Sequence, residues 1–542
     1  MNVAQAVGQA LARVGVDHVF GVVGSGNFHV SNAMVGAGSR FVAARHEAGA
    51  ATMADAFARM SGKVAAVSVH QGCGLTNAMT GITEAAKSRT PLVVLAAEVA
   101  QPRSNFYVDQ EGLARSVGAL PLRVTAAEDA VAKACEAVAI ALHSRRTVLL
   151  NLPLEVQALE ATGATEPVLP EPPSTVSPSD SDVAELVQLL ERARRPVFVA
   201  GRGARGVGCR EALESLAARC GGLLATSAVA KGLFNGNPWS LDVSGGFASP
   251  TAAELIRGAD VIVGWGCALN MWTTRHGRLI APDATVAQVD LDTEAIGAHR
   301  VVDLGVVGDV RATAQAAGAQ ITDTSGYRSD GVRERIADAI RWRDVPYTDA
   351  SSDGRIDPRT LSIALDDLLP AERVVSVDSG NFMGYPSMFW SVPDEWGFCF
   401  TQAFQSIGLG LSTAIGAALA RPDRLSVAAL GDGGALMSVA ELETVARLGL
   451  PMVVVVYNDD AYGAEVHHFG PDGFPLDTVQ FPPTDIAAIA RGFGFEAVTV
   501  RGTEDLEPVG AWLSGDRGSP LLIDAKVTRD EPSWWLEEAF RG

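Results

Sequence analysis

The sequence predicts an α/β protein built from three units, each a doubly wound parallel sheet with helices on both faces. Short runs of β-branched residues begin at Val64, Val93, Val197, Val261 and Val453, and amphipathic helical stretches separate them. This alternation of strand and helix is typical of parallel sheets. With 542 residues, of which 47% are hydrophobic, the chain is long enough to bury several cores.

Two polar segments mark the predicted boundaries. In the first, GATEPVLPEPPSTVSPSDSD, proline, serine and acidic residues replace the hydrophobic periodicity, as in a linker. The second contains GYRSDGV and TDASSDGRIDP around one short helical segment, 332–342. The predicted division is 1–162, linker 163–182, 183–322, linker 323–358 and 359–542.

Charge and composition favour small-molecule chemistry by a soluble protein of the cytoplasm. A formal charge of −20 disfavours contact with nucleic acids or anionic membranes, which reward Lys and Arg. The amino terminus lacks a basic region followed by an apolar run, and no uncharged apolar stretch reaches the length of a bilayer span, about 18 residues. The scattered cysteines form no CxxC pair, so we interpret them as reduced thiols: Cys73, Cys135, Cys209, Cys220, Cys267 and Cys399.

The strongest chemical signal lies in SVAALGDGGALMSVAELETVARLGLPMVVVVYNDDAYG. Its pattern of strand, glycine turn, helix, strand and acidic turn places Asp432 and Asp459 at the carboxyl ends of strands, where open parallel sheets bind ligands. Gly431, Gly433 and Gly434 expose backbone amides at a helix start, which suits a diphosphate. A pair of carboxylates beside a diphosphate suits Mg²⁺, which takes oxygen ligands. An ordinary turn and an ordinary loop are the alternative.

This stretch resembles the thiamine-diphosphate motif, which begins GDG and ends in an Asn-rich turn. The separation from Asp432 to Asp459 is 27 residues. The resemblance implies that Mg²⁺ is held by Asp432, by Asp459 in place of the more usual Asn, and by the backbone carbonyl of Ala461. It also implies cofactor contacts by Gly380, Asn381, Gly431, Gly433, Gly434, Tyr462 and Gly463.

The segment HEAGAATMADAFAR predicts a helix that opens with Glu47. The helix dipole alone can explain a carboxylate at this place. The phrase also resembles HExGAxxMAxGYAR of acetohydroxyacid synthases, whose Glu contacts the aminopyrimidine of the cofactor. The resemblance implies that Glu47 favours the imino tautomer, which removes the C2 proton of the thiazolium and so starts the carbanion chemistry of the cofactor.

A bulky apolar residue must separate the two rings of the folded cofactor. The resemblance assigns this role to Ile407 in TQAFQSIGLGLSTAIGAALA, where core packing would otherwise be the default interpretation. Relatives usually have Gly two positions earlier, where a backbone carbonyl receives the aminopyrimidine N4′, but this chain has Gln405. The carbonyl is still present, and the local conformation stays open.

The resemblance to acetohydroxyacid synthases extends along most of the chain. Further similar phrases are VFGVVGSGN, HQGCGLTNAMTGI, TPLVVLAAEV, TVLLNLPLEVQ and VDLDTEAIG. They imply pyrimidine-binding, central and diphosphate-binding domains in that order. Because Glu47 and Asp432 fall in different domains, the resemblance implies a homodimer or homotetramer whose active sites lie at the subunit interface.

Polar residues of the N-terminal part are candidates for substrate contact. Ser25 and His70 match substrate-contacting positions of benzoylformate decarboxylases, and Gln110 matches a Gln near the thiazolium in acetohydroxyacid synthases. A His at such a place can transfer protons near neutral pH. Each residue has an alternative: Ser25 stabilises a turn, His70 is a satisfied strand-end histidine, and Gln110 lies at the surface.

Departures from the synthase pattern weigh against ordinary acetolactate production. Asp109 stands where synthases have Phe, and His467 and His468 fall within the phrase that reads QWE in synthases. These histidines either contact or protonate a different substrate, or they are solvated.

A competing motif follows a predicted strand at 196–200. Gly201, Gly203 and Gly206 form G-x-G-x-x-G and are expected to open a helix, as in dinucleotide sites. An NAD site also needs an acid about 20 residues further on, where this chain has Thr226. NAD is therefore not expected. FAD, which acetohydroxyacid synthases hold in this domain, is possible but not favoured, because their GMLGMHG and RFDDR phrases read DVSGGFA and ALNMWTT here.

The leading hypothesis is an enzyme that uses thiamine diphosphate and Mg²⁺ to decarboxylate a 2-oxo acid such as pyruvate. The remaining fragment then joins an acceptor carbonyl, or is protonated to an aldehyde as in a decarboxylase of the benzoylformate type. A noncatalytic paralogue is the alternative outside enzymes, and its mark would be loss of Glu47 or the metal residues. An NAD dehydrogenase would rest on the glycine motif alone.

Overall fold

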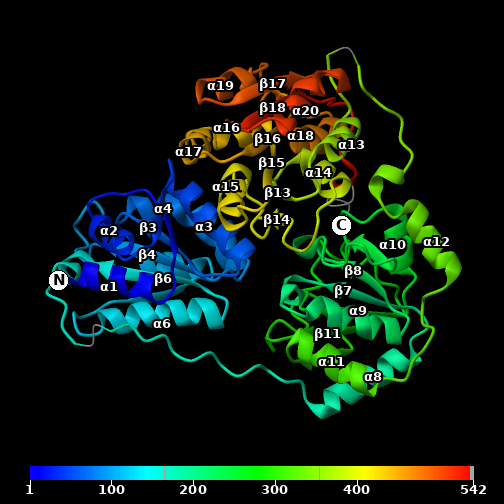
Figure 1. The fold of residues 1–542 in the computed structure, drawn as a ribbon, viewed down its shortest axis with the longest axis horizontal. Coiled ribbons are helices and arrows are strands. Elements are labelled where there is room, and N and C mark those ends of the chain that lie inside the picture. Colours follow the sequence, from blue (N-terminus) through cyan, green and yellow to red (C-terminus); the bar gives the residue numbers. More distant parts are fainter. Residues whose placement is uncertain (164–165, 353, 537–542) are drawn as a thin grey trace.

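The computed structural model describes residues 1–163, 166–352 and 354–536. Among them it contains three six-stranded sheets in which every strand pair is parallel. Figure 1 shows each sheet with helices on both of its faces, in an N-terminal unit (blue to cyan), a central unit (green) and a C-terminal unit (yellow to red). The predicted fold class is confirmed.

The N-terminal unit runs from α1 to α7. Its strands are β1 (His18–Gly21), β2 (Arg40–Ala43), β3 (Ala65–Val69), β4 (Leu92–Glu98), β5 (Leu120–Arg123) and β6 (Thr147–Pro153). Its helices are α1 (Val3–Arg13), α2 (Phe28–Gly36), α3 (Glu47–Ser61), α4 (Cys73–Lys87), α5 (Gln110–Ser116), α6 (Ala130–His143) and α7 (Leu154–Gln157).

The central unit runs from α8 to α11. Its strands are β7 (Pro196–Ala200), β8 (Leu223–Thr226), β9 (Ser240–Val243), β10 (Val261–Trp265), β11 (Thr285–Asp290) and β12 (Leu304–Val307). Its helices are α8 (Asp180–Arg192), η1 (Arg202–Arg205), α9 (Cys209–Arg219), η2 (Ala228–Ala230), α10 (Pro250–Arg257) and α11 (Val310–Gln320).

The C-terminal unit follows two short helices, α12 (Asp330–Ala339) and η3 (Trp342–Asp344). Its strands are β13 (Arg373–Val377), β14 (Phe398–Phe400), β15 (Leu425–Gly431), β16 (Met452–Asn458), β17 (Glu496–Val500) and β18 (Leu521–Lys526). Its helices are α13 (Pro358–Leu368), η4 (Asn381–Met383), α14 (Gly384–Phe389), α15 (Gly410–Ala420), α16 (Asp432–Met437), α17 (Glu441–Leu448), α18 (Gly463–Phe469), η5 (Gly470–Asp472), α19 (Ile486–Gly492), η6 (Thr503–Leu506) and α20 (Glu507–Ser514).

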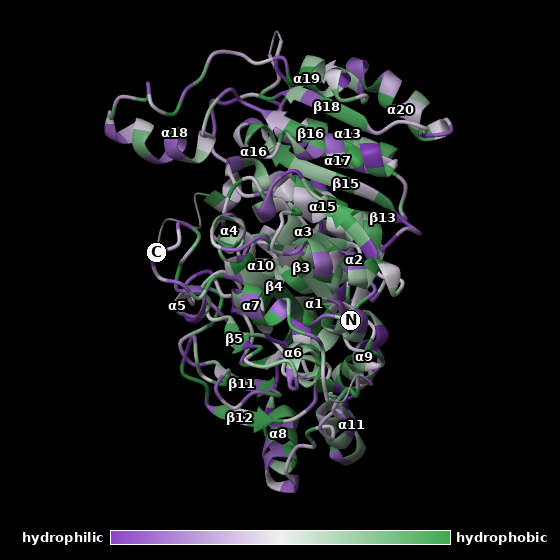
Figure 2. Ribbon diagram, turned by 90° about the vertical axis from the view of Figure 1, so that its left-hand side faces the viewer, coloured by the Kyte–Doolittle hydropathy of each residue, from purple (hydrophilic) through white to green (hydrophobic). Residues whose placement is uncertain are grey.

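The strand sequences explain why both faces of each sheet are covered. Every residue of β16, MVVVVYN, is buried, and β3, β4 and β6 are buried along their whole length. A run without polar alternation cannot face water on one side, so helices must cover both faces. Figure 2 shows the same contrast, with hydrophobic strands such as β15 and β18 inside and a more hydrophilic α17 outside.

The sheets of the N-terminal and C-terminal units share one strand order, and the sheet of the central unit has another. The N-terminal order is β2-β1-β3-β4-β6-β5, and the C-terminal sheet repeats it as β14-β13-β15-β16-β18-β17. The central order, β12-β11-β10-β7-β8-β9, is that of dinucleotide-binding folds, with its switch point between β7 and β10. Ligands of such sheets bind beyond the carboxyl ends of the strands.

The first predicted linker lies outside the three sheets. Residues 166–179 contain no helix or strand and run from the N-terminal unit to the central unit (Figure 1). The predicted domain bounds themselves stay a prediction. The six cysteines are free thiols. Among the described helices, none combines the length and the apolar character needed to cross a bilayer.

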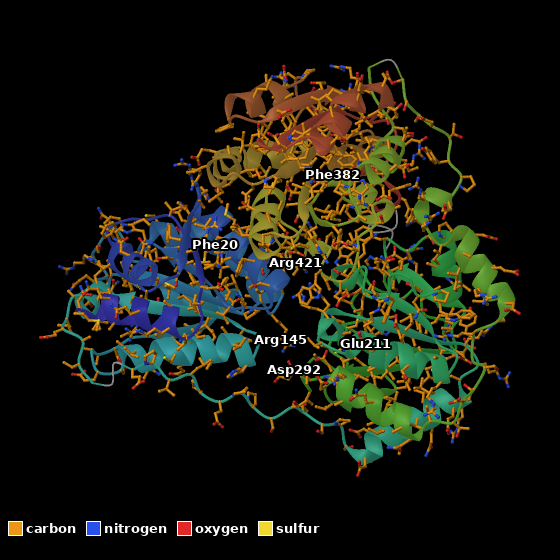
Figure 3. All side chains as sticks on the ribbon, viewed as in Figure 1. Phe20, Arg145, Glu211, Asp292, Phe382 and Arg421 are labelled. Atoms are coloured by element: carbon orange, nitrogen blue, oxygen red, sulfur yellow. The ribbon has the colours of Figure 1, made fainter. Side chains whose placement is uncertain are left out.

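A buried ion network joins the N-terminal and C-terminal units. The Arg59 guanidinium donates to Asp55 at 2.8 Å and to Glu84 at 2.8 Å, and all three side chains are at most 4% exposed. The Glu84 carboxylate also accepts from the backbone amides of Ala403 at 3.1 Å and Phe404 at 2.6 Å, which belong to the C-terminal unit. The central unit adds an ion pair on the surface between Arg89 of the N-terminal unit and its own Asp292, and Asp292 is labelled in Figure 3.

Replacing Glu84 with Ala is expected to destabilise the protein by about 3–5 kcal/mol, because it leaves the Arg59 charge under-compensated inside the protein. It also removes the acceptor of the backbone amides of Ala403 and Phe404. The midpoint of urea denaturation measures the effect. The control is Glu111→Ala, which breaks solvent-accessible pairs with Arg115 and Arg123 and should cost no more than about 1 kcal/mol. Equal losses in the two variants would contradict the role of the network.

Candidate active site

Three aspartates follow three neighbouring strands of the C-terminal sheet. Asp378, Asp432 and Asp459 come directly after β13, β15 and β16, which pair side by side. Each is at most 9% exposed. The convergence of Asp432 and Asp459 follows from their strand-end positions, as the sequence indicates. Asp378 was missed, although its own strand-end position in VVSVDSG was a usable signal.

Asp432 and Asp459 form a buried acidic pair. Their carboxyl groups lie within hydrogen-bonding reach of each other. The pKa of Asp432 is raised well above its usual range, mainly by burial and secondly by repulsion from Asp459. Burial also raises the pKa of Asp459. Two buried like charges of this kind fit a bound divalent cation, which would neutralise them.

Backbone and non-protein oxygens can complete the ligand set of such a cation. Among the described residues, no group of three or more His, Cys, Asp or Glu side chains is placed to hold a metal. The predicted third ligand is the carbonyl of Ala461, a residue whose backbone amide donates to the Asp459 carboxylate at 3.2 Å. Mg²⁺ commonly keeps phosphate and water oxygens in its shell, so a site with two carboxylates and one carbonyl fits this ion.

The glycines of the diphosphate turn are required by close contacts. A Cβ on Gly433 would lie 2.7 Å from the ring of Tyr462, and one on Gly434 would lie 2.2 Å from the carboxylate of Asp378. A Cβ on Gly463 would lie 2.3 Å from the carboxylate of Asp459. None of these glycines has a positive φ. The turn therefore needs glycine for space and not for its backbone conformation.

The loop after β16 is held from outside by Arg355. Its guanidinium donates to the backbone carbonyl of Asn458 at 3.3 Å and forms an ion pair with Asp460 at 2.5 Å. Asp460 has a φ of 55°, a left-handed conformation that disfavours L residues. The Asn458 amide donates to Asp524 at 2.8 Å. These contacts fix the backbone around Asp459.

Asp378 organises the turn that carries Ile407. Its carboxylate accepts the backbone amides of Gly408 at 3.0 Å and Leu409 at 3.2 Å, directly before α15. Burial raises the pKa of Asp378 to about 6, and the donated hydrogen bonds oppose this shift. Ile407 lies against the diphosphate turn, because a Cβ on Gly434 would be 3.4 Å from its Cγ2. The predicted wedge residue and the predicted diphosphate turn are thus neighbours.

Gln405 has a φ of 62°, so it adopts the left-handed conformation that glycine adopts at low cost. The side chain is exposed, so neither packing nor burial accounts for the choice of residue. The conformation that the sequence left open is therefore the glycine-like one.

The substitution Gln405→Gly is expected to be neutral or to stabilise the protein by up to about 1 kcal/mol, because relief of left-handed strain offsets the greater entropy of the unfolded chain. The substitution Gln405→Val should destabilise by about 1–2 kcal/mol, because a β-branched residue fits this conformation poorly. Thermal unfolding of the variants measures both effects. Equal stability of the Gly and Val variants would contradict the assigned conformation.

The turn at Gly380 and Asn381 is tied to the C-terminal segment. Gly380 has φ 140° and ψ 177°, a conformation open essentially to glycine alone. The backbone carbonyl of Asn381 accepts from Ser533 Oγ at 2.7 Å and from Trp535 Nε1 at 2.8 Å, and its side-chain oxygen accepts from the Ser533 amide. The side-chain oxygen of Asn381 is thereby used within the chain. Its predicted cofactor contact stays a prediction.

Glu47 is the first residue of α3, as predicted. His46 is the N-cap residue, and its Nδ1 accepts from the amide of Ala48 at 3.1 Å. The Glu47 side chain is half-buried and accepts from Asn77 Nδ2 at 3.1 Å. Among the described residues, no hydrogen bond connects Glu47 to the C-terminal sheet. Within one chain it is therefore not joined to the acidic pair.

His70 and Ser25 lie together at the carboxyl ends of β1 and β3. His70 Nδ1 accepts from the amide of Gly26 at 3.3 Å, so the neutral ring carries its proton on Nε2. The ring of Phe106 packs edge-on against it at 5.5 Å. Ser25 is exposed in the turn after β1. Beside them, Gln71 is buried, and its Oε1 has no partner among the described residues.

Gln110 is 2% exposed, so its alternative placement at the surface is wrong. Its Oε1 accepts from the amide of Gly72 at 3.3 Å, and its Nε2 donates to Asn151 at 2.8 Å. This bridge holds the turn between β3 and α4. Asp109, the neighbouring departure from the synthase pattern, caps α5 by accepting from the amide of Gly112 at 2.9 Å.

His467 and His468 lie on α18, which follows the loop of Asp459 and Ala461 and stands at the periphery of the molecule in Figure 2. His467 is half-buried, and burial lowers its pKa. Its Nε2 has no hydrogen-bond partner within the described part of the chain. His468 is exposed and its ring packs against Phe469 at 4.7 Å. Their contact with a substrate stays a prediction.

The central glycine motif is used for packing. A Cβ on Gly201 would lie 2.3 Å from the carbonyl of Gly266, and the amide of Gly203 donates to that carbonyl at 3.0 Å. The prediction that the motif opens an α-helix is wrong: the short 3-10 helix η1 lies within the motif, and α9 begins at Cys209, three residues after Gly206. The N-terminus of α9, with Gly208 as its N-cap, lies beyond the turn, whereas in a usual dinucleotide fold the helix opens within the glycine motif at the phosphate site. The expectation against NAD and FAD stays a prediction.

Comparison with known families covers each of the three units. The N-terminal TPP binding domain of thiamine pyrophosphate enzymes matches residues 1–119, the central domain of these enzymes matches residues 183–317, and their C-terminal TPP binding domain matches residues 378–525. The chain belongs to the thiamine pyrophosphate enzyme family. The resemblance found in the sequence is confirmed.

Curated relatives from this family differ in activity. The chain is 28% identical to the acetolactate synthase large subunit of Parasynechococcus marenigrum, with 97% of this chain and 88% of that protein covered. It is also 28% identical to a sulfoacetaldehyde acetyltransferase of Rhodobacter capsulatus, with 100% and 96% covered. A probable 2-ketoarginine decarboxylase of Pseudomonas aeruginosa is 28% identical, with 94% and 90% covered. Equal identity to a synthase, a transferase and a decarboxylase supports a thiamine-dependent enzyme of this family and leaves its reaction to be argued from the site.

Proposed function

We propose that this chain is a thiamine-diphosphate- and Mg²⁺-dependent enzyme that decarboxylates a 2-oxo acid and joins the retained fragment to an acceptor carbonyl. The observation that carries the proposal is the buried pair Asp432 and Asp459 beside the crowded glycine turn. A noncatalytic paralogue has no need of two repelling buried carboxylates, because they destabilise a protein without a cation.

The site residues have different roles in binding the cofactor and the metal. Asp432, Asp459 and the Ala461 carbonyl would hold the Mg²⁺ that accompanies the diphosphate, and Ile407 and the Gln405 carbonyl would contact the rings of the cofactor. Thiamine diphosphate supplies the carbanion chemistry that makes loss of CO₂ from a 2-oxo acid possible. Glu47 would hydrogen-bond the aminopyrimidine and so set its protonation state.

A decarboxylase is the second candidate, and the tautomer of His70 favours it. Because Nδ1 accepts from Gly26, the Nε2–H is the proton that His70 can donate toward a bound substrate. Donation to the retained fragment would release an aldehyde, whereas attack on an acceptor carbonyl would give a carboligation product. The two reactions share the binding residues and differ only in this last step.

One experiment separates the two reactions. Protein, Mg²⁺ and thiamine diphosphate are incubated with a panel of 2-oxo acids, with and without aldehydes or second 2-oxo acids, and products are identified by mass spectrometry. Carboligation predicts products whose mass is the sum of the two substrates less one CO₂. Aldehyde as the sole product would establish the decarboxylase, and no loss of CO₂ from any 2-oxo acid in the panel would contradict both.

We further propose a homodimer in which Glu47 of one copy meets the diphosphate site of the other. Exposed apolar side chains flank both halves of the site. In the N-terminal unit they are Val23, Phe28, Phe106 and Tyr107, and in the C-terminal unit they are Leu436, Met437, Phe469, Phe474 and Phe481. Exposed apolar surface of this kind marks an interface.

Mixing two inactive variants tests the shared site. Glu47→Gln and Asp432→Ala each disable both sites of a homodimer, but a mixed dimer has one site in which both residues are intact. After subunit exchange, about a quarter of the wild-type activity is expected from closed twofold symmetry. A mixture that stays inactive, with exchange verified by mass spectrometry, would contradict the shared site.

A further inference from the structure

Glu441 reaches from the C-terminal unit to the start of a helix in the N-terminal unit. It is the first residue of α17 and is 2% exposed. Its Oε1 accepts from the backbone amides of Arg45 at 2.9 Å and His46 at 3.0 Å. Its Oε2 accepts from Thr444 Oγ1 at 2.6 Å. Both oxygens of this buried carboxylate are therefore in use.

The two amides that Glu441 accepts stand immediately before α3, whose first residue is Glu47. The amides at a helix start have no partner within the helix, and a carboxylate there is stabilised by the helix dipole. His46, which belongs to the same unit as α3, caps its first turn. Glu441 holds the approach to the helix from another unit, so the direction in which the chain enters α3 depends on contact between the two units.

Gly49 leaves the space that the carboxylate occupies. A Cβ at this position would lie 2.6 Å from Glu441 Oε1 and 3.1 Å from Ser412 Oγ. Its φ is not positive, so the glycine is not needed for its backbone conformation. The glycine at the third position of α3 is thus explained by the long-range contact with Glu441.

We propose that Glu441 is a positioning residue for Glu47. By accepting both amides before α3, it fixes the backbone from which the Glu47 side chain extends, and so fixes the place of the Glu47 carboxylate in the active site. The inference rests on the proposed function of Glu47 and concerns how this carboxylate is held.

Glu443 provides a matched control on the same helix. Its carboxylate accepts from the Arg45 side chain, with Nε at 2.6 Å, and also pairs with Arg447. It is 30% exposed. Glu443 therefore touches the same residue as Glu441, but through the side chain at the surface and without holding a backbone amide.

The first measurement uses the cofactor-free protein. Hydrogen exchange at the amides of Arg45 and His46 should become about tenfold faster or more in Glu441→Ala, because each amide loses a bond to a charged acceptor. Glu441→Gln, which keeps an acceptor oxygen, should retain most of the protection, and Glu443→Ala should exchange like the wild type. Unchanged exchange in Glu441→Ala would overturn the proposal. The hydrogen-exchange result does not depend on the role of Glu47.

The second measurement distinguishes positioning from simple stabilisation. With thiamine diphosphate and Mg²⁺ at saturation, exchange of the cofactor C2 proton should be about tenfold slower or more in Glu441→Ala, partly restored in Glu441→Gln and normal in Glu443→Ala. The dissociation constant of thiamine diphosphate should change little. Normal C2 exchange in a Glu441→Ala protein with lowered stability would overturn positioning. If Glu47→Gln also left C2 exchange normal, the proposed function would fail instead.

Discussion

The Glu47→Gln variant is expected to exchange the C2 proton of bound thiamine diphosphate about 100-fold more slowly than the wild type, or slower still, because loss of a positioned acid or base typically costs this much. Gln can still accept from Asn77, as Glu47 does at 3.1 Å. The fold and the oligomer should therefore be unchanged. Proton exchange is followed by quenching and NMR, and overall turnover should fall in parallel.

The Asn77→Ala variant is the control for this prediction. It removes the contact with Glu47 but leaves the carboxylate in place, so its effect on C2 exchange should be much smaller. If a Glu47→Gln variant saturated with cofactor exchanged the C2 proton at the wild-type rate, the assignment of Glu47 to the aminopyrimidine would be wrong.

The Asp432→Ala variant is expected to weaken binding of Mg²⁺ and thiamine diphosphate by about 100-fold or more, because even outer partners of metal ligands are worth 10–100-fold in affinity. The substitution removes one of the two side-chain ligands and leaves Asp459 beside the glycine turn without its partner. Titration of the apoprotein with thiamine diphosphate at fixed Mg²⁺, followed by tryptophan fluorescence, measures the loss.

The Asp459→Asn variant keeps a ligand oxygen at this position and removes the negative charge, so it separates the two contributions to metal binding. An amide oxygen can still bind the cation, so the affinity for Mg²⁺ should fall by no more than about tenfold. In the absence of metal this variant also relieves the repulsion between the buried carboxylates, so its thermal midpoint should equal or exceed that of the wild type. Undiminished cofactor affinity in Asp432→Ala would mean that the diphosphate site is misplaced.

The strand-end aspartates show what local sequence can predict. A run such as MVVVVYN has no polar side, so it predicts a strand buried on both faces, and parallel strands bring their carboxyl ends to one edge. Asp432 and Asp459 can therefore be placed together from the sequence. Asp378 obeys the same rule after β13, and it was missed because no family phrase drew attention to it.

Gln405 and Gln110 show where local sequence fails. The left-handed conformation of Gln405 is set in a turn whose following amides, Gly408 and Leu409, bind Asp378. Gln110 is buried because its amide bridges Gly72 and Asn151, which are far away along the chain. Neither environment leaves a periodic pattern in the neighbouring residues.

The glycine motif of the central unit shows how one pattern can serve two structures. G-x-G-x-x-G after a strand fits a dinucleotide turn, and the strand order of this sheet fits as well. Only the approach of Gly266 shows that Gly201 and Gly203 are needed for close backbone packing.

The sequence by itself therefore determined the three parallel sheets, the family resemblance and the convergence of Asp432 with Asp459, because these depend on short-range periodicity and on strand ends. Only the tertiary structure decided how α3 is held, because Glu441 and the amides before Glu47 lie almost 400 residues apart. Contacts over such distances depend on how the units pack, and packing is decided by shape and burial across the whole chain.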